Sequence, residues 1–349
     1  MGLRILHSAD WHLDSPFTGF SPSQRELLKK AQQKIPQQVA DICRRENCDL
    51  VLLSGDLFDG AYNADTVELV KNALKACGVP VFISPGNHDF CTPGSPWLEE
   101  TWPENVYIFT GGLESVAVKE LDCRIYGAGY QSMDCPGLME GFRAEGEERY
   151  QIAVLHGDPV QLRSPYCPIT AAQVRDSALD YLALGHIHKA GAFRAGSTLC
   201  GWPGTPMGRG YDETGEKGLY LVEIGEETHI RRIMLDMPQF QELTVNTDEE
   251  DVENLLPAVG NSHFYRVILT GSGEDMPEDI QTKFPNMEIL DRREAPVDLW
   301  DSAEEDTLEG TYFRILREAM VNADPDSAAQ IQLAAKLSRK ILEGREVVL

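Results

Sequence analysis

The sequence of 349 residues is poor in basic side chains, because 31 lysines and arginines stand against 56 aspartates and glutamates. Its formal net charge is therefore -25. A chain this acidic lacks the broad cationic face with which many nucleic-acid-binding proteins neutralise phosphates. Any nucleic-acid partner must be held by a local feature of the chain or through another subunit.

Long apolar runs and paired cysteines are also missing. No stretch approaches the ~18 consecutive apolar residues of a membrane span, and the N-terminus, MGLRILHSAD, reaches a charged residue too early for a signal peptide. The eight cysteines are scattered and form no C-x-x-C pair, which favours reduced thiols over disulfides or a zinc site. We therefore expect a cytoplasmic protein with no membrane partner.

Short apolar runs alternate with amphipathic stretches over the first hundred residues. The predicted elements are strands at 3–9, 49–55 and 79–84 and helices at 23–46 and 63–77. We expect Pro36 to bend or split the first helix, because proline removes a backbone donor from a helix interior. This alternation indicates parallel strands with helices on the faces of the sheet.

Strands dominate from about residue 106 to 235, with one helix expected near 170–178. The pattern predicts an α/β fold, a layered sandwich of two mixed sheets with helices outside. Near residue 240 the pattern changes to a compact strand–helix–strand–helix–strand unit, followed by an acidic linker over 295–307 and two helices. The predicted domains are residues 1–240, a small α/β domain at 241–302 and a helical tail at 303–349.

Potential metal ligands follow the ends of several predicted strands. Ligands collect at the carboxyl ends of strands in an open α/β sheet, so we expect these side chains to converge on one pocket. A mixed set of oxygen and imidazole donors suits Mn²⁺, Fe²⁺ or Zn²⁺ better than Ca²⁺. The candidate ligands, which suffice for two ions if Asp56 is shared, are Asp10, His12, Asp56, Asn87, His156, His186 and His188.

Each of these segments alone also has a purely structural interpretation. Asp56 and Asp59 can cap a turn, and a single histidine such as His156 is more often a core residue than a ligand. His186 and His188 alternate, so on a strand both face the same side. The order and spacing of all the segments together favour a metal centre.

The ordered segments DWH, GDLFD, GNHD, LHGD and GHIH resemble the calcineurin-like metallophosphoesterases over roughly residues 1–235. The segments HSADWHLDSPF, LGHIHKAG and ETGEKGLYLVEI further resemble the SbcD-type DNA-repair exonucleases, and within them the YhaO-like group. The resemblance implies a four-layer metallophosphoesterase sandwich with a small capping domain. The helical tail stands where relatives bind an SbcC-type ATPase.

The resemblance also assigns roles to individual residues. It places Asp10, His12, Asp56 and His188 on a first metal and Asp56, Asn87, His156 and His186 on a second. It makes His88 a catalytic residue that contacts the phosphate and assists the leaving oxygen. Asp59 and Asp89 would support the site without binding metal, Asp89 by orienting His88 or the loop. Trp11 stands where the family has a small or aliphatic residue, and we expect its side chain to point away from the metals.

The favoured function is metal-dependent hydrolysis of DNA phosphodiesters, as an exonuclease or endonuclease in DNA repair. Two divalent ions, with Mn²⁺ favoured and Fe²⁺ and Zn²⁺ as alternatives, would activate a bridging hydroxide. DNA and an SbcC-type ATPase are the expected partners, and a homodimer is a further expectation from the family. Two alternatives stay open: a phosphoesterase for a small molecule such as a cyclic nucleotide or for a phosphoprotein, and a non-catalytic adaptor for an ATPase.

Overall fold

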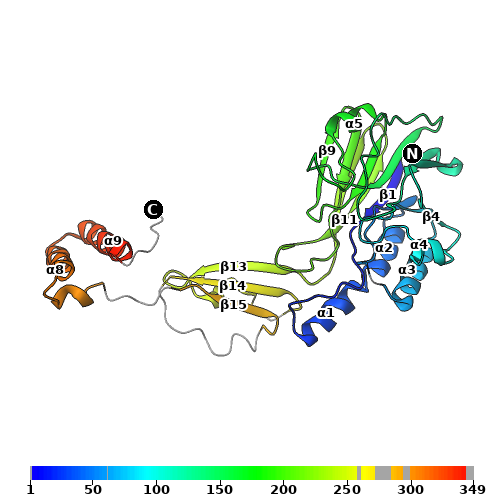
Figure 1. Cartoon of the computed structure of the whole chain (residues 1–349). Coiled ribbons are helices and arrows are strands. Elements are labelled where there is room, and N and C mark those ends of the chain that lie inside the picture. Colours follow the sequence, from blue (N-terminus) through cyan, green and yellow to red (C-terminus); the bar gives the residue numbers. More distant parts are fainter. Residues whose placement is uncertain (1, 61, 258–260, 272–283, 294–298, 343–349) are drawn as a thin grey trace. The chain divides into compact units, whose positions relative to one another are not determined.

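The computed structural model describes residues 2–60, 62–257, 261–271, 284–293 and 299–342 (Figure 1). The chain divides into two compact units. The first comprises Met1–Leu243, Ala258–Val267 and Gln281–Glu288, and the second comprises Thr244–Pro257, Ile268–Ile280 and Ile289–Leu349. The domain boundaries expected at residues 240 and 302 stay predictions.

The first unit contains a six-stranded mixed sheet with the strand order β12-β11-β1-β2-β3-β4. Its strands are β1 (Leu3–Ser8), β2 (Leu50–Leu53), β3 (Val81–Ile83), β4 (Val106–Ile108), β11 (Gly218–Ile224) and β12 (Thr228–Met234). The strands β1, β2 and β3 pair in parallel, as the sequence predicts, and β4 joins β3 in parallel. The strands β11 and β12 add antiparallel neighbours at the other edge.

A second six-stranded mixed sheet has the strand order β5-β6-β7-β8-β10-β9. Its strands are β5 (Glu114–Val118), β6 (Cys123–Gly127), β7 (Tyr150–His156), β8 (Tyr181–Gly185), β9 (Gly191–Ala195) and β10 (Thr198–Trp202). The central strands are parallel and both edge strands are antiparallel. Two mixed sheets are what the sequence predicts for this region.

Helices and short turns connect these strands. They are α1 (Pro22–Gln32), α2 (Ile35–Arg45), α3 (Ala64–Cys77), α4 (Pro96–Glu99), η1 (Lys119–Leu121) and α5 (Ala171–Asp176). The predicted helix at 23–46 is split into α1 and α2, and Pro36 lies in the first turn of α2, where its missing N–H is not needed. Asn63 caps α3, and Gly78 ends it in the left-handed conformation that glycine adopts readily.

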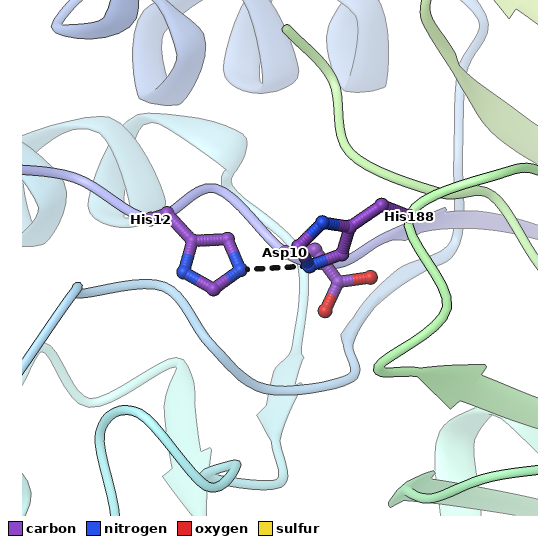
Figure 2. A group of neighbouring side chains, drawn as sticks. All are labelled: Asp10, His12 and His188. Carbon is purple, nitrogen blue, oxygen red and sulfur yellow. Dashed lines mark hydrogen bonds between the residues drawn. The ribbon is translucent and has the colours of Figure 1, made fainter. Parts of the chain in front are cut away.

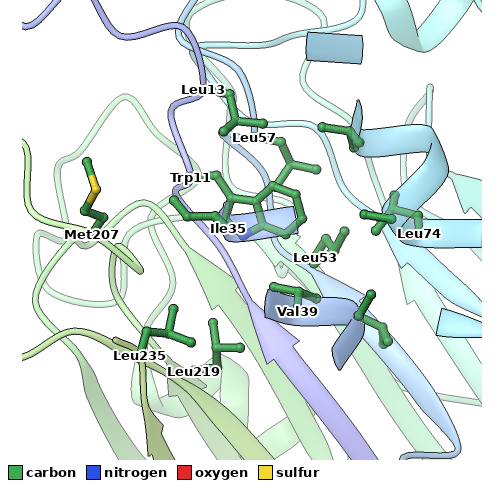
Figure 3. Packing of buried hydrophobic residues seen from close by; sticks show 14 of the residues in the cluster. Trp11, Leu13, Ile35, Val39, Leu53, Leu57, Leu74, Met207, Leu219 and Leu235 are labelled. Atoms are coloured by element: carbon green, nitrogen blue, oxygen red, sulfur yellow. The ribbon is translucent and has the colours of Figure 1, made fainter. Parts of the chain in front are cut away.

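The apolar side chains form layered cores that explain the sandwich. Figure 3 shows Val39 of α2 and Leu74 of α3 packed with Leu53 of β2 on the outer side of the first sheet. Leu52 points to the opposite face, where the two sheets pack together. Val174 of α5 lies in a third core on the outer side of the second sheet. The order helix–sheet–sheet–helix is the four-layer α/β sandwich predicted from the sequence.

Trp11 belongs to the outer core of the first sheet. Its indole is buried, and its N–H donates to the hydroxyl of Ser8 at 2.7 Å. The side chain therefore faces the packed helices, as expected, and not the carboxyl-terminal edge of the sheet.

The remaining strands and helices lie towards the C-terminus. The strands β13 (Phe240–Asn246), β14 (Phe264–Thr270) and β15 (Met287–Asp291) form a sheet with β14 in the middle, and α6 (Val252–Leu255) follows β13. The second helix predicted for this region, over 277–284, lies outside the described residues except for its last position. The tail contains η2 (Asp301–Glu304), α8 (Leu308–Val321) and α9 (Pro325–Leu342), so the predicted acidic linker includes one short 3-10 turn.

The two tail helices share a small core with η2. Phe313 of α8 is buried with Ala303 and Ala335, and the guanidinium of Arg339 lies 4.3 Å from the centre of the Phe313 ring. Several large apolar side chains on α8 and α9 stay exposed: Leu308, Ile315, Val321, Leu333 and Ile341. Among the described residues, none of the helices is both long and apolar enough to span a bilayer.

Candidate metal centre

The loops that follow the parallel strands of both sheets carry the predicted ligands. The loops after β1 and β2 are joined by backbone hydrogen bonds from Asp10 N–H to Gly55 O at 3.0 Å and from His12 N–H to Asp56 O at 2.9 Å. Asp10, His12, Asp56 and His186 all adopt positive φ angles, between 47° and 96°. Such backbone conformations in residues other than glycine are strained, and they are typical of functional sites.

One group of donor atoms comes from Asp10, His12 and His188, which point towards one another in Figure 2. Their donor atoms lie within 4.8 Å of one another, and the two Nε2 atoms of His12 and His188 are 3.1 Å apart. Asp10 accepts the backbone N–H of His186 through Oδ1 at 2.9 Å. Its other oxygen, Oδ2, is buried and has no hydrogen-bond partner among the described residues. A buried carboxylate oxygen without a partner is unfavourable, so this pocket suits a cation.

A second group is built around the side-chain oxygen of Asn87. This Oδ1 atom lies 2.9 Å from His156 Nε2 and 3.2 Å from His186 Nδ1. Asp56 Oδ2 lies 3.3 Å from His156 Nε2 and 3.8 Å from His12 Nε2, so this carboxylate stands between the two groups. All seven predicted ligands are thus brought together, and their assignment to two ions stays a prediction.

Gly86 makes room for this arrangement. A Cβ atom at this position would lie 2.3 Å from Asp56 Oδ1 and 2.8 Å from His156 Nδ1, closer than carbon approaches such atoms. The glycine of the GNHD segment is therefore required by the close approach of the Asp56 and His156 side chains to the backbone.

Hydrogen bonds on the far side of the rings fix the orientation of two of the histidines. His12 Nδ1 lies 3.2 Å from Asp59 Oδ1, and His156 Nδ1 lies 2.8 Å from the carbonyl oxygen of Ser54. In both rings the Nδ1 atom is engaged, so Nε2 is directed towards the other ligands. Asp59 therefore lies where the sequence predicts a supporting carboxylate.

His88 is more exposed than the histidines around it, with 39% of its side chain accessible. Its Nδ1 atom lies 3.0 Å from Asp59 Oδ1, and its backbone N–H donates to Asp56 Oδ1 at 2.8 Å. The contact with Asp59 raises the pKa of His88, whereas burial lowers the pKa of His12. Donor atoms of His12, Asp56 and His88 also lie within 4.8 Å of one another, so the role of His88 outside the ligand set stays a prediction.

Asp89 braces the loop that carries Asp56. Its buried carboxylate accepts the backbone N–H groups of Gly86 at 2.7 Å and of Leu57 at 2.8 Å, with longer contacts to the N–H groups of Asp56 and Phe58. Burial raises the pKa of this carboxyl to about 7, while the four N–H donors favour its ionised form. Of the two roles expected for Asp89, these contacts match the orientation of the loop.

Sequence reasoning missed two carboxylates that contact ligand histidines. Glu213 is buried, and its Oε1 lies 2.6 Å from His188 Nδ1. Burial opposes its ionisation, but the bond to His188 and the charge of Arg209 lower the pKa of Glu213 to about 2. Asp158 Oδ2 lies 3.9 Å from His186 Nε2. Asp158 lies in the segment LHGD and Glu213 in the segment ETGEKGLYLVEI, both of which carry the resemblance to the family. Membership in these segments was the sequence signal that could have identified the two carboxylates.

Comparisons with known proteins agree with this geometry. The chain matches the calcineurin-like phosphoesterase family over residues 3–190, which include every predicted ligand. The metallophosphoesterase YhaO of Bacillus subtilis, whose function is uncharacterised, is 36% identical over 239 residues, covering 64% of this chain and 57% of that protein. The chain thus spans little more than half the length of this relative.

The SbcD component of the nuclease SbcCD from Staphylococcus epidermidis is 23% identical over 309 residues, covering 75% of this chain and 77% of that protein. Among solved structures, a dimetal phosphatase from Danio rerio overlaps 66% of this chain and 95% of its own, with a TM-score of 0.45 and 13% identity. Because the family match spans more than half of the sequence and contains the whole set of converging ligands, this chain belongs to the calcineurin-like phosphoesterase family.

Proposed function

We propose that this protein hydrolyses phosphodiester bonds in DNA with the help of two divalent metal ions. The observation that carries the proposal is the convergence of seven side chains with oxygen and imidazole donors at one edge of the sandwich, among them a buried Asp10 oxygen that has no partner among the described residues. When bound, two such cations neutralise the oxygens of a phosphate and lower the pKa of water. The mixed donor set favours Mn²⁺ over Ca²⁺.

The residues divide into two groups around a shared carboxylate. Asp10, His12 and His188 would hold one ion, Asn87, His156 and His186 would hold the other, and Asp56 would contact both. The supporting contacts from Asp59, Ser54 and Glu213 keep the ligand nitrogens directed inwards, which leaves little reorganisation when the ions bind.

His88 is the residue best placed to act on the substrate itself. Asp59 engages its Nδ1 atom, so Nε2 is the ring nitrogen left to contact a phosphate oxygen or the departing sugar oxygen. The partial exposure of the ring allows this contact, whereas His12 and His156 are fully buried. His88 would thus stabilise the leaving group without holding a metal.

An apolar rim beside the metal residues supports a substrate that carries nucleobases. Met133 is exposed, and its sulfur lies 3.8 Å from Asn87 Nδ2. The centroid of the Tyr166 ring lies 4.7 Å from that of the His186 ring. The flat faces of nucleobases stack on aromatic side chains such as Tyr166, whichever base is present. The name of the SbcCD relatives, a nuclease, points in the same direction.

The exposed apolar side chains of α8 and α9 support an association with an ATPase of the SbcC type. The small core that α8 and α9 share with η2 is formed by Phe313, Ala303 and Ala335, and it leaves Ile315 and Leu333 exposed to water. Exposed apolar patches of this kind mark protein interaction sites, and a helix pair fits a groove on a partner.

The decisive experiment offers the purified protein labelled single- and double-stranded oligonucleotides and, separately, bis-p-nitrophenyl phosphate. Mn²⁺ is either present or removed with a chelator, at low ionic strength. We expect both substrate types to be cleaved only with Mn²⁺. Cleavage of the small phosphodiester without cleavage of DNA would instead establish a small-molecule phosphoesterase. Inactivity on both substrates at full metal content would leave the adaptor role.

A further inference from the structure

Arg209 lies beside the metal centre, on the side of His12, His88 and His188. Its Nη2 atom is 3.3 Å from both Glu213 Oε1 and His188 Nδ1, and its Nη1 atom is 3.7 Å from Asp59 Oδ1. The side chain is 25% exposed, so the guanidinium is held at the rim of the site and remains accessible from solvent.

The hydrogen-bonding capacity of this guanidinium is largely unused. Guanidinium groups carry five N–H donors, yet Nε of Arg209 is buried without a partner among the described residues, and the contacts of its Nη atoms are long. Arg124, by contrast, forms the usual bidentate pair with a carboxylate, because its Nε and Nη2 atoms donate to the two oxygens of Glu148 at 2.8 and 2.9 Å.

The neighbouring carboxylates are already occupied by other donors. Glu213 contacts His188 through Oε1 and accepts the backbone N–H of Arg209 through Oε2 at 2.8 Å. Asp59 contacts His12, His88 and the hydroxyl of Ser15. Arg209 is therefore attracted to this corner by two anions but is not paired with either in a fork-to-carboxylate geometry.

We propose that Arg209 is a phosphate-binding residue of this site and that its guanidinium donates to an anionic oxygen of the bound phosphate group. The planar fork of arginine matches phosphate oxygens, and hydrogen bonds from a cation to an anion are the strong ones. In a chain with a net charge of -25, a cation fixed beside the metal residues supplies a local attraction for an anionic substrate. The inference rests on the phosphoesterase activity proposed above and does not require DNA to be the substrate.

A purely structural role for Arg209 makes a different prediction. An arginine that only holds Glu213 against His188 would act on metal binding, because the orientation of a ligand histidine depends on its outer partner. An arginine that binds phosphate would act on phosphate affinity and on the KM of small phosphodiesters, with the metal content unchanged.

The test uses the manganese-loaded full-length protein and inorganic phosphate as the probe, measured by titration calorimetry. Arg209→Ala should weaken phosphate binding by roughly 10- to 100-fold, the range for a hydrogen bond to a charged group, and should raise the KM for bis-p-nitrophenyl phosphate more than it lowers kcat. Arg209→Lys keeps the positive charge but loses the planar guanidinium, so its phosphate affinity and KM should lie between those of the wild type and those of Arg209→Ala. Arg231→Ala removes the same charge from an exposed pair with Glu46 and should change neither quantity.

The metal content of each variant is measured alongside its phosphate affinity. Wild-type phosphate affinity in Arg209→Ala at full metal content overturns the inference. If Arg209→Ala loses manganese, the Arg209→Lys variant is measured in its place. Weakened phosphate binding by Arg209→Lys at full metal content supports the inference. Wild-type phosphate binding by Arg209→Lys, or loss of manganese from that variant as well, overturns the inference. Should the wild-type protein bind phosphate through Arg209 but leave DNA intact, the proposed DNA substrate fails while the inference stands.

Discussion

The metal centre and the C-terminal helix pair depart from the ordinary distribution of side chains in opposite ways. At the metal centre, charged and polar groups such as Asp10, His12 and Asp56 are almost fully buried. On α8 and α9, large apolar groups such as Leu308 and Val321 are exposed to solvent. Buried polar groups and exposed apolar patches are the informative exceptions to the usual burial of residues.

The metal centre and the helix pair are each incomplete alone, and the missing contacts differ between them. Among the described residues, Asp10 Oδ2 is the buried carboxylate or imidazole atom of the metal centre that has no hydrogen-bond partner, and a cation would complete its contacts. In the helix pair, the Nη atoms of Arg339 contact Glu309, Asp301 and Ser302, and an apolar partner surface would cover the exposed apolar side chains. Substitutions at the buried polar groups should therefore damage metal binding and hydrolysis, whereas substitutions at the exposed apolar groups should damage association with a partner.

The largest expected effect comes from the carboxylate that stands between the two ligand groups. Asp56→Asn should remove both metal ions and abolish hydrolysis, because one neutral amide replaces an anion that contacts both groups. Metal content of the purified variant, measured by plasma mass spectrometry, checks this outcome. Retention of one ion at full occupancy would show that Asp56 does not bridge.

The next effect in size separates the ligands from the residue proposed to act on the substrate. His88→Ala should keep the metal content and the melting temperature of the wild type while turnover falls by about 10²–10⁴, the range for loss of a general acid. Steady-state kinetics with bis-p-nitrophenyl phosphate measure the loss. A variant depleted of metal would place His88 among the ligands and contradict the proposed role.

Glu213 provides a smaller effect on the same network. Glu213→Gln removes the charge behind His188 and should weaken manganese binding by roughly 10- to 100-fold, as other outer partners of ligand histidines do. A titration against a competing chelator gives the affinity. Glu223→Gln, which alters an exposed glutamate paired with Arg4, is the matched control and should leave the affinity unchanged. Equal affinities in the two variants would show that Glu213 does not support the site.

These residues also mark how far the sequence could be interpreted. Asp10, Asp56 and His156 could be predicted because each follows directly on an apolar strand, and parallel strands end at a common edge. Glu213 follows no strand, because it lies 25 residues beyond His188 in a loop and meets the ring only through the tertiary fold, so only its place in the segment ETGEKGLYLVEI could have marked it. Its acidic character is ordinary in a chain with 56 acidic residues, so composition gave no signal.

The fold shows the same division between local and tertiary information. The layers of the sandwich follow from the alternation of strands and helices, and the break near Pro36 follows from the chemistry of proline. The antiparallel addition of β11 beside β1 joins segments more than two hundred residues apart, and their pairing is not encoded in any local pattern. The first helix predicted for the small strand–helix–strand–helix–strand unit, over 248–259, contains the four residues of α6 among its described residues.

Substitutions on the helix pair should affect association and leave catalysis unchanged. Ile315→Asp and Leu333→Asp replace exposed apolar side chains, so the melting temperature and the hydrolysis of small phosphodiesters should stay at wild-type values, while capture of a purified SbcC-type ATPase weakens. Ala319→Asp adds the same charge to α8 without removing a large apolar group and serves as the control. A marked fall in melting temperature with Ile315→Asp would instead mean that this side chain belongs to the protein's own core.

The smallest expected effect is on the salt dependence of DNA binding, and it tests the contrast between a site with a fixed arginine and an acidic chain. The affinity for duplex DNA falls with salt at a logarithmic slope of about -0.9 for each phosphate neutralised. Because acidic residues outnumber basic ones by 56 to 31, we expect only about two to four such contacts, and hence a shallow slope.

If Arg209 is one of them, Arg209→Ala should make the slope shallower by about one contact, whereas Arg231→Ala should not. Fluorescence anisotropy with a labelled duplex across a salt series measures both slopes. A slope as steep as about -8 would require a basic surface for which neither the composition nor the surroundings of the metal residues provide the charges.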